Sequence, residues 1–229
     1  MTKPYYEKCV DDITLTIDPD DHESADPRDN DNLGTMICMH NRYTLGDSKH
    51  YALPEEQRLF FNDQGEPVED EADAESYGSL IISGSGVFKE AEQSLWFLKL
   101  VEAEGGVVMP LYLYDHGGVT MSTSTFSDPW DSGVVGYIYV TRAKLVEEYG
   151  DASEETKTTA RNVLESEVKE YAMFLEGDVW KFEITSPNED ECDSCHGILG
   201  YENCESEAEA SLTAIVEARC RGLAAREDR

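Results

Sequence analysis

Four residues near the C-terminal end carry side chains that bind transition metals: Cys192, Cys195, His196 and Cys204. Three thiolates and an imidazole form a common ligand set for zinc, and the C-x-x-C spacing of the first pair is typical of such sites. The separation between His196 and Cys204 is unusual for a structural zinc site. Zinc is therefore one hypothesis for a cofactor. The alternative is no cofactor, with ordinary cysteines in an acidic loop before a helix.

A second group of residues has the types needed for acid–base chemistry. His116 follows Asp115 directly, and the hydroxyl-bearing residues 122–124 come shortly afterwards. Hydrolases combine a serine nucleophile, a histidine base and an aspartate in this way. The G-x-S-x-G string that presents such a serine is missing, and a single histidine in a turn is more often structural. His40 and Arg42 form another small polar cluster. We assign no catalytic residue, and the sequence favours a protein that is not an enzyme.

The string Asp-Pro-Trp-Asp-Ser-Gly at residues 128–133 combines a fixed turn, a large aromatic ring and two carboxylates. In one interpretation Asp128 caps local backbone amides and Trp130 anchors the loop on the core. In the other, the string is a recognition loop in which Asp128 and Asp131 contact a partner. Both interpretations stay open at this point.

Acidic residues dominate the composition. The 229 residues include 49 Asp and Glu against 18 Lys and Arg, which gives a formal net charge of −31. Such a charge repels nucleic acids and anionic membranes, and it attracts basic surfaces. We therefore expect neither direct nucleic-acid binding nor a membrane partner. The expected partner is a basic protein, most simply one that itself binds nucleic acid.

The acidic residues gather in three blocks, at residues 1–31, 54–76 and 188–209. A packed core cannot absorb such charge, so we interpret each block as loops or exposed faces. From these blocks and from the 128–133 string we select candidate partner-binding carboxylates. They are Asp18, Asp20, Asp21, Glu23, Glu69, Asp70, Glu71, Asp73, Asp128, Asp131, Glu189, Asp190 and Glu191.

Better-patterned segments lie between the acidic blocks. Apolar alternation predicts strands at residues 13–17, 107–114, 119–122, 134–140 and 178–185, and a turn at 115–118 makes a hairpin of two of them. Residues 35–39 are compatible with either a further short strand or a buried turn. Helical spacing predicts helices at residues 89–104, 141–150, 153–177 and 206–226. Strands and helices mix without a regular β-α-β alternation. The expected fold is α+β, a mostly antiparallel sheet flanked by three or four helices.

The string Ser-Gly-Ser-Gly at residues 83–86 is typical of a flexible joint. It suggests an acidic N-terminal region at residues 1–86, which can still belong to the same fold, and an α+β core with a C-terminal helix at residues 87–229. Residues 1–6 lead into a charged stretch, and no segment approaches the roughly 18 consecutive apolar residues of a membrane span. We therefore expect a cytoplasmic protein.

Several strings resemble a family of proteins carried by bacteriophages and mobile elements. They are LYLYDHGG at 111–118, DPWDSG at 128–133 and GYIYV at 136–140, with further matches at 31–46, 171–179 and 193–197. The family commonly has Trp where this chain has His196, and Cys192 is not one of its regular features. Both departures count against the zinc site. The family has no assigned catalysis, so the resemblance implies only a setting: a mobile-element protein that acts in the cytoplasm of a bacterial host.

Three functions are compatible with these observations. The first is an acidic phage-type inhibitor or DNA mimic, whose carboxylates lie where phosphates would and occupy the basic channel of a host defence protein such as a restriction or CRISPR effector. The second is acidity adapted to a high-salt host. The third is a zinc-binding or hydrolytic enzyme that uses Cys195, His116 and residues 128–131. We rank the first highest, because the acid is clustered rather than evenly spread.

Overall fold

The computed structural model describes residues 3–20, 25–38, 40, 42–47, 59–61, 67–68, 76–78, 98–99, 101–128, 130–187 and 191–227. The chain forms two compact units. The terminal unit comprises residues 1–27 and 170–229, and the central unit comprises residues 28–169. Each unit contains antiparallel strands and helices, which confirms the α+β class. The chain therefore divides at residues 27 and 169, whereas the joint expected at 83–86 lies outside the described residues.

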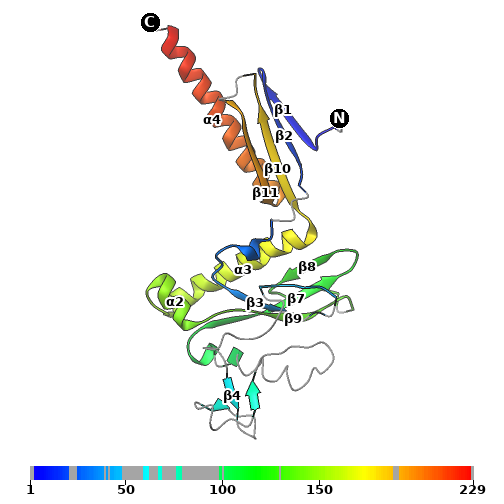
Figure 1. Ribbon diagram of the computed structural model, residues 1–229, viewed down its shortest axis with the longest axis vertical. Coiled ribbons are helices and arrows are strands. Elements are labelled where there is room, and N and C mark those ends of the chain that lie inside the picture. The colour runs from blue at the N-terminus through cyan, green and yellow to red at the C-terminus, as the bar shows by residue number, and fades with distance from the viewer. Residues whose placement is uncertain are drawn as a thin grey trace. The chain divides into compact units, whose positions relative to one another are not determined.

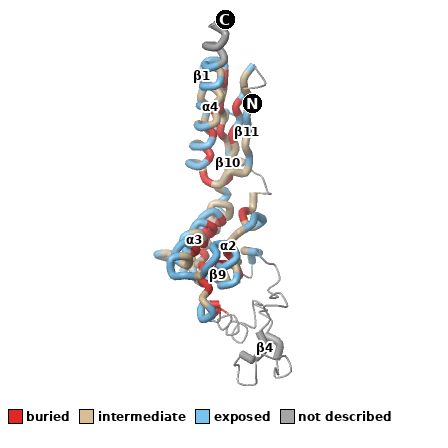
Figure 2. The backbone as a smooth tube through the Cα atoms, turned by 90° about the vertical axis from the view of Figure 1, so that its left-hand side faces the viewer, coloured by how far each residue is buried: buried red, intermediate tan, exposed pale blue. Residues whose placement is uncertain are grey.

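The terminal unit is a four-stranded antiparallel sheet with one long helix on it (Figure 1). The strands are β1 (Tyr6–Val10), β2 (Ile13–Pro19), β10 (Val179–Thr185) and β11 (Asp193–Leu199), in the order β1-β2-β10-β11. The helix is α4 (Tyr201–Glu227). Figure 2 shows that buried positions on α4 face the sheet and exposed positions face away from it.

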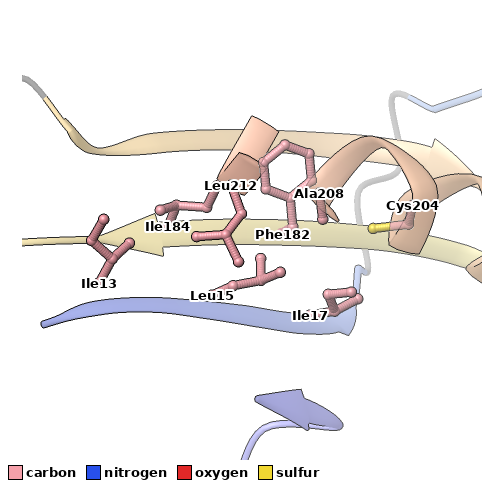
Figure 3. Close-up of a cluster of buried hydrophobic side chains, with 8 residues drawn as sticks. All are labelled: Ile13, Leu15, Ile17, Phe182, Ile184, Cys204, Ala208 and Leu212. Carbon is pink, nitrogen blue, oxygen red and sulfur yellow. The ribbon is translucent and has the colours of Figure 1, made fainter. Parts of the chain in front are cut away.

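The core of the terminal unit forms where one face of the sheet packs against one face of the helix, and each face follows from the side-chain periodicity of its element. Alternate residues of β2 and β10 point to one face of the sheet, and every fourth residue of α4 points back at them. Figure 3 shows the resulting cluster, whose buried members are Ile13, Leu15, Ile17, Phe182, Ile184, Cys204, Ala208 and Leu212. Removing this apolar surface from water is what fixes α4 on the sheet.

The central unit has a sheet of strands β3 (Thr35–Cys38), β9 (Ser132–Val140), β7 (Val107–Asp115) and β8 (Val119–Ser122), in the order β3-β9-β7-β8. Helix α2 (Arg142–Tyr149) follows β9, and the boundary between the units falls within α3 (Glu154–Glu176). The structure also contains a 3-10 turn, η1 (Pro27–Asp29), and a small sheet of β4 (Leu59–Phe61), β5 (Pro67–Val68) and β6 (Ser76–Gly78).

Most of the predicted elements are confirmed. The hairpin of residues 107–122 forms as β7 and β8. Helix α2 begins after Thr141, whose hydroxyl accepts from the amide of Lys144, and it ends at Gly150 in the left-handed conformation. Helix α3 lies within the predicted range of 153–177. The helix predicted at 89–104 is present at residues 98–99 and 101–103, and the rest of it lies outside the described residues.

Two acidic stretches contain regular structure that the sequence did not indicate. Strand β1 lies in the first acidic block, and strand β11 lies in the third. Helix α4 begins at Tyr201, before the predicted start at residue 206. Its early turns carry acid on the solvent side, while Cys204 is buried against the sheet. Charge on one face of an element does not prevent burial of the other face.

A buried ion cluster fixes the segment before β3 to helix α3 within the central unit. The Arg28 side chain is 3% exposed, and its Nη1 lies 3.1 Å from Glu167 Oε2. Its Nε and Nη2 both donate to the carboxylate of Asp47. Burial alone would lower the pKa of Arg28, but its hydrogen bonds and charge interactions with Asp47 and Glu167 raise it.

Glu167 also accepts hydrogen bonds from the backbone on the other side of the same cluster. The amide of Leu33 donates to Oε1 at 2.7 Å, and the amide of Gly34 donates to Oε2 at 3.2 Å. A side chain at position 34 would collide with Leu164, since a Cβ there would lie 2.4 Å from Leu164 Cδ2. The glycine therefore permits the close approach that this buried carboxylate requires.

Candidate functional site

A hollow of about 400 Å³ lies at the end of β7 and the start of β9 in the central unit. We call it the Trp130 pocket. Apolar and polar residues both line it, namely His40, Arg42, Leu113, Asp115, Trp130, Asp131, Ser132, Gly133, Val134 and Val135. Two polar clusters that the sequence analysis treated separately, at residues 40–42 and 115–116, thus meet the 128–133 string here.

The floor of the Trp130 pocket is part of the sheet. Leu113 and Val135 are both buried, and Leu113 pairs with Gly133 across the two strands. The pairing register between β7 and β9 shifts at Leu111 and Tyr112, just before this point. The pocket is therefore built on hydrogen-bonded strands, which hold its rim residues in place better than an isolated loop could.

Asp115 forms one side of the rim. Its Oδ2 lies 3.5 Å from Nη1 of Arg42 and accepts a hydrogen bond of 3.3 Å from the hydroxyl of Tyr43. The backbone amide of Asp115 donates to the carbonyl of Asp131 at 2.9 Å. The Arg42 side chain is 74% exposed, so its guanidinium rests on the carboxylate with most of its surface in solvent.

Asp131 and His40 also contribute polar groups to the pocket. Nδ1 of His116 lies 2.7 Å from Oδ2 of Asp131, which joins the β7–β8 turn to the neighbouring loop. Nδ1 of His40 accepts hydrogen bonds of 3.2 Å from the amides of Arg42 and Tyr43, and its ring stacks on that of Tyr43. A ring nitrogen that accepts carries no proton, so the proton of neutral His40 lies on Nε2.

Local hydrogen bonds shape the loop that carries Trp130. Oδ1 of Asp128 accepts from the amide of Trp130 at 2.9 Å, and the hydroxyl of Ser132 donates to the carbonyl of Asp128. Asp128 therefore caps the turn, as the first interpretation of this string expects. The second part of that interpretation is wrong, because Trp130 is 92% exposed and does not anchor the loop on the core.

Five of the thirteen candidate carboxylates lie within the described residues: Asp18, Asp20, Asp128, Asp131 and Glu191. Asp18 accepts from the amide of Tyr5, Glu191 accepts from the guanidinium of Arg219, and the side chain of Asp20 is 3% exposed. The carboxylate of Asp20 accepts from the amide of Gly197 at 2.9 Å. These carboxylates contribute to the fold itself. Of the five, Asp131 lines the Trp130 pocket.

The remaining eight candidate carboxylates lie outside the described residues. They are Asp21, Glu23, Glu69, Asp70, Glu71, Asp73, Glu189 and Asp190. The first and third acidic blocks contribute mainly to the terminal unit, and the second block belongs to the central unit. A role for these eight residues in binding a partner stays a prediction.

The four residues of the zinc hypothesis occupy different surroundings in the terminal unit. Cys204 is buried in the core, and burial raises the pKa of its thiol to about 11. Cys195 packs beside this core, Cys192 is exposed, and Nδ1 of His196 lies 3.6 Å from Oδ2 of Asp20. Among the described residues, no group of three or more His, Cys, Asp or Glu side chains is placed to hold a metal ion.

The pair of His116 and Asp131 supplies two of the three groups of a hydrolytic triad. Within the described part of the chain, the side chain of His116 hydrogen-bonds to Asp131 and not to any serine, threonine or cysteine. The hydroxyl of Ser132 is engaged by the carbonyl of Asp128, and that of Ser122 accepts from the amide of Ser124. The Trp130 pocket therefore presents charged groups, hydrogen-bonding groups and an exposed indole, all of which can bind a ligand.

Two residues of this site and one structural cluster were not predicted from the sequence. Tyr43 and Val134 were not singled out, although both are large and exposed beside the pocket. Arg28 and Glu167 were not expected to be buried. The sequence contained one indication that Arg28 forms ion pairs, since it is one of only three basic residues in the first acidic block.

Comparisons with models of protein families, with curated proteins and with solved structures find no match to this chain. The resemblance to bacteriophage and mobile-element proteins therefore stays a prediction. Within the described residues, no helix combines the length and the apolar character needed to cross a membrane.

Proposed function

We propose that this protein acts by binding, as an acidic inhibitor that presents the Trp130 pocket to a basic surface of another protein. The observation that carries the proposal is the exposed indole of Trp130 beside the carboxylates of Asp115 and Asp131. A large aromatic ring held in solvent has lost the burial that normally stabilises it. Binding surfaces use such rings as anchors, and tryptophan is enriched among their energetically dominant residues.

Other exposed apolar residues lie at the same place. Val134 lines the Trp130 pocket, and Tyr43 lies on its rim through the hydrogen bond to Asp115. Both belong to the small set of large hydrophobic residues that are exposed among the described residues. Single exposed apolar residues are ordinary, but a group of them around one hollow is typical of an interaction site.

Charge selects the kind of partner. The chain carries a formal charge of −31, and the rim of the pocket adds carboxylates next to the aromatic anchor. Complementary charge speeds association and rejects acidic partners. Proteins that bind nucleic acid have the basic surfaces that fit, and competition for such a surface would inhibit them. The resemblance to phage and mobile-element proteins favours a host restriction or CRISPR effector, met in the bacterial cytoplasm.

Capture from bacterial lysate with matched variants tests this proposal. The wild type is compared with Trp130→Ala and with Tyr149→Ala, which removes another exposed aromatic ring from α2 of the same unit. We expect a basic nucleic-acid-binding protein to be retained by the wild type and by Tyr149→Ala, and lost from Trp130→Ala. Raised salt should release it, because exposed charges are screened. Equal retention by Trp130→Ala would contradict the proposal.

A further inference from the structure

We infer that the Trp130 pocket receives an arginine side chain of the partner, with its guanidinium between the Trp130 indole and the Asp115 carboxylate. This inference rests on the proposed function and names the chemistry of the contact. It is carried by three features of the described residues: a guanidinium already placed at the carboxylate, a carboxylate that hydrogen bonds hold in orientation, and a hollow of side-chain size that an exposed aromatic ring lines.

The first feature is Arg42. Its guanidinium meets Asp115 in one contact of 3.5 Å and is 74% exposed. The contrast with Arg28 is clear, since Arg28 is buried and binds Asp47 through two nitrogen atoms. The Arg42 contact shows that the Asp115 carboxylate can accept a guanidinium from the side of the pocket. Because this contact is single and long, it holds the Arg42 guanidinium only weakly. A partner's arginine can therefore replace Arg42.

The second feature is the environment of the carboxylate. Tyr43 donates its hydroxyl to Asp115, and the amide of Asp115 is fixed by the carbonyl of Asp131. The carboxylate is thus oriented before a ligand arrives. An incoming guanidinium offers several parallel N–H donors in one plane, which a carboxylate can accept as a pair of hydrogen bonds.

The third feature is the combination of size and apolar surface. The hollow of about 400 Å³ lies at the small end of the range for ligand sites, so it fits a side chain better than an extended ligand. The buried residues Leu113 and Val135 can contact the apolar stem of an arginine, and the exposed Trp130 ring can stack on its planar head. Lysine has a compact charge that neither stacks nor forms paired hydrogen bonds.

The opposite effects of two substitutions make the inference testable. Asp115→Asn keeps an acceptor oxygen for Tyr43 but removes the charge, and it should weaken arginine binding about tenfold, as expected for a charge-assisted hydrogen bond. Arg42→Gln removes the internal competitor, and it should strengthen arginine binding about two- to fivefold, in line with the loss of an exposed ion pair. Tyr149→Ala should leave binding unchanged.

The experiment is an NMR titration of the full chain with N-acetylarginine amide, followed at the indole N–H of Trp130. A single side chain should bind with a dissociation constant on the order of 1 mM. The lysine amide should bind more weakly, and the citrulline amide, which has a similar shape and no charge, should not shift the indole signal. Trp130→Phe assigns that signal among the three tryptophans of the chain.

The results separate this inference from the proposed function. Equal shifts with arginine and citrulline, or weaker arginine binding by Arg42→Gln, would overturn the arginine pocket. The lysate capture would still support the proposed function if it depended on Trp130. If arginine binds as expected but no basic protein is retained, the pocket stands as an arginine site and the inhibitor proposal fails.

Discussion

Nδ1 of His116 and Oδ2 of Asp131 lie 2.7 Å apart, and this contact joins the turn after β7 to the loop that carries Trp130. A second link, from the amide of Asp115 to the carbonyl of Asp131, runs beside it. The loop that carries the exposed indole is therefore attached, at the neighbouring residue Asp131, to the end of the β7–β8 hairpin by two contacts. A binding anchor held in this way loses less conformational freedom when a partner arrives.

Removing the imidazole of His116 should loosen this loop without unfolding the protein. Because the pair is exposed, His116→Ala should cost less than about 1 kcal/mol of folding stability. The indole N–H of Trp130 should become more mobile in ¹⁵N relaxation measurements. His196→Ala, which alters an exposed histidine of the terminal unit, serves as the control. Unchanged Trp130 relaxation in His116→Ala would show that the contact does not order the loop.

Removing the cation from the buried cluster around Arg28 should strongly destabilise the central unit. Arg28→Met leaves the buried carboxylate of Glu167 and the partly exposed carboxylate of Asp47 without their cation. Breaking a buried pair in this way costs about 3–5 kcal/mol. Faster hydrogen exchange at the amides of Gly34 and Met36 would report this loss of stability directly, since both amides donate to these carboxylates.

A matched exposed pair provides the control for the buried one. Arg221→Met removes the partner of Glu217 on the surface of α4, and such a pair contributes about 0–1 kcal/mol. In Arg221→Met, hydrogen exchange at the amides of Gly34 and Met36 should stay as in the wild type. An effect of Arg28→Met as small as that of Arg221→Met would mean that the cluster is not buried in solution.

Five of the six cysteines should divide into two classes by reactivity. Cys9, Cys192 and Cys220 are exposed, and Cys38 and Cys204 are buried. Burial raises the pKa of Cys38 to about 12, and the reactive species is the thiolate. Iodoacetamide at pH 8 should therefore modify the exposed group first and the buried pair only on unfolding, as peptide mass spectrometry can show. Slower alkylation of Cys192 in the presence of added zinc would support the zinc hypothesis.

The raised pKa of Cys38 also predicts a loss of stability in alkali. A folded-state pKa of about 12 against an ordinary 9.0 means that the folded state favours the neutral thiol. Its stabilising contribution is complete below pH 9 and is lost as the pH rises from there to about 12. In denaturant unfolding, Cys38→Ala should have a lower free energy of unfolding than the wild type below pH 9. That free energy should then fall less steeply with pH than the wild-type value between pH 9 and 12. Cys9→Ala, an exposed control, should keep the wild-type slope.

The elements that the sequence predicted well are those whose signals are local. The string from Thr141 to Gly150 contains both caps of α2, and the alternation in residues 107–122 specifies a hairpin by itself. Strands β1 and β11 were missed because their signals are not local. They are edge strands, and their pairing with β2 and β10 supplies what their acidic sequences do not indicate.

The candidate site was predictable in its parts but not as a whole. The sequence singled out His116, the clustered His40 and Arg42, and the 128–133 string, each on the basis of residue type. Their meeting depends on the pairing of β7 with β9 and on the segment after β3, which are long-range relationships. The acidic candidates were chosen for charge alone, and charge does not reveal which carboxylates, such as Asp20, are used within the fold.

The most direct test of the account is competition for a basic nucleic-acid-binding surface. Purified restriction and CRISPR effector nucleases are each bound to a fluorescent DNA duplex, and the loss of anisotropy is followed as this protein is added. We predict that the wild type and Tyr149→Ala displace DNA from at least one nuclease, while Trp130→Ala requires about tenfold more protein, as loss of a central aromatic anchor implies. Displacement by Trp130→Ala at the wild-type concentration, or no displacement by the wild type, would contradict the account.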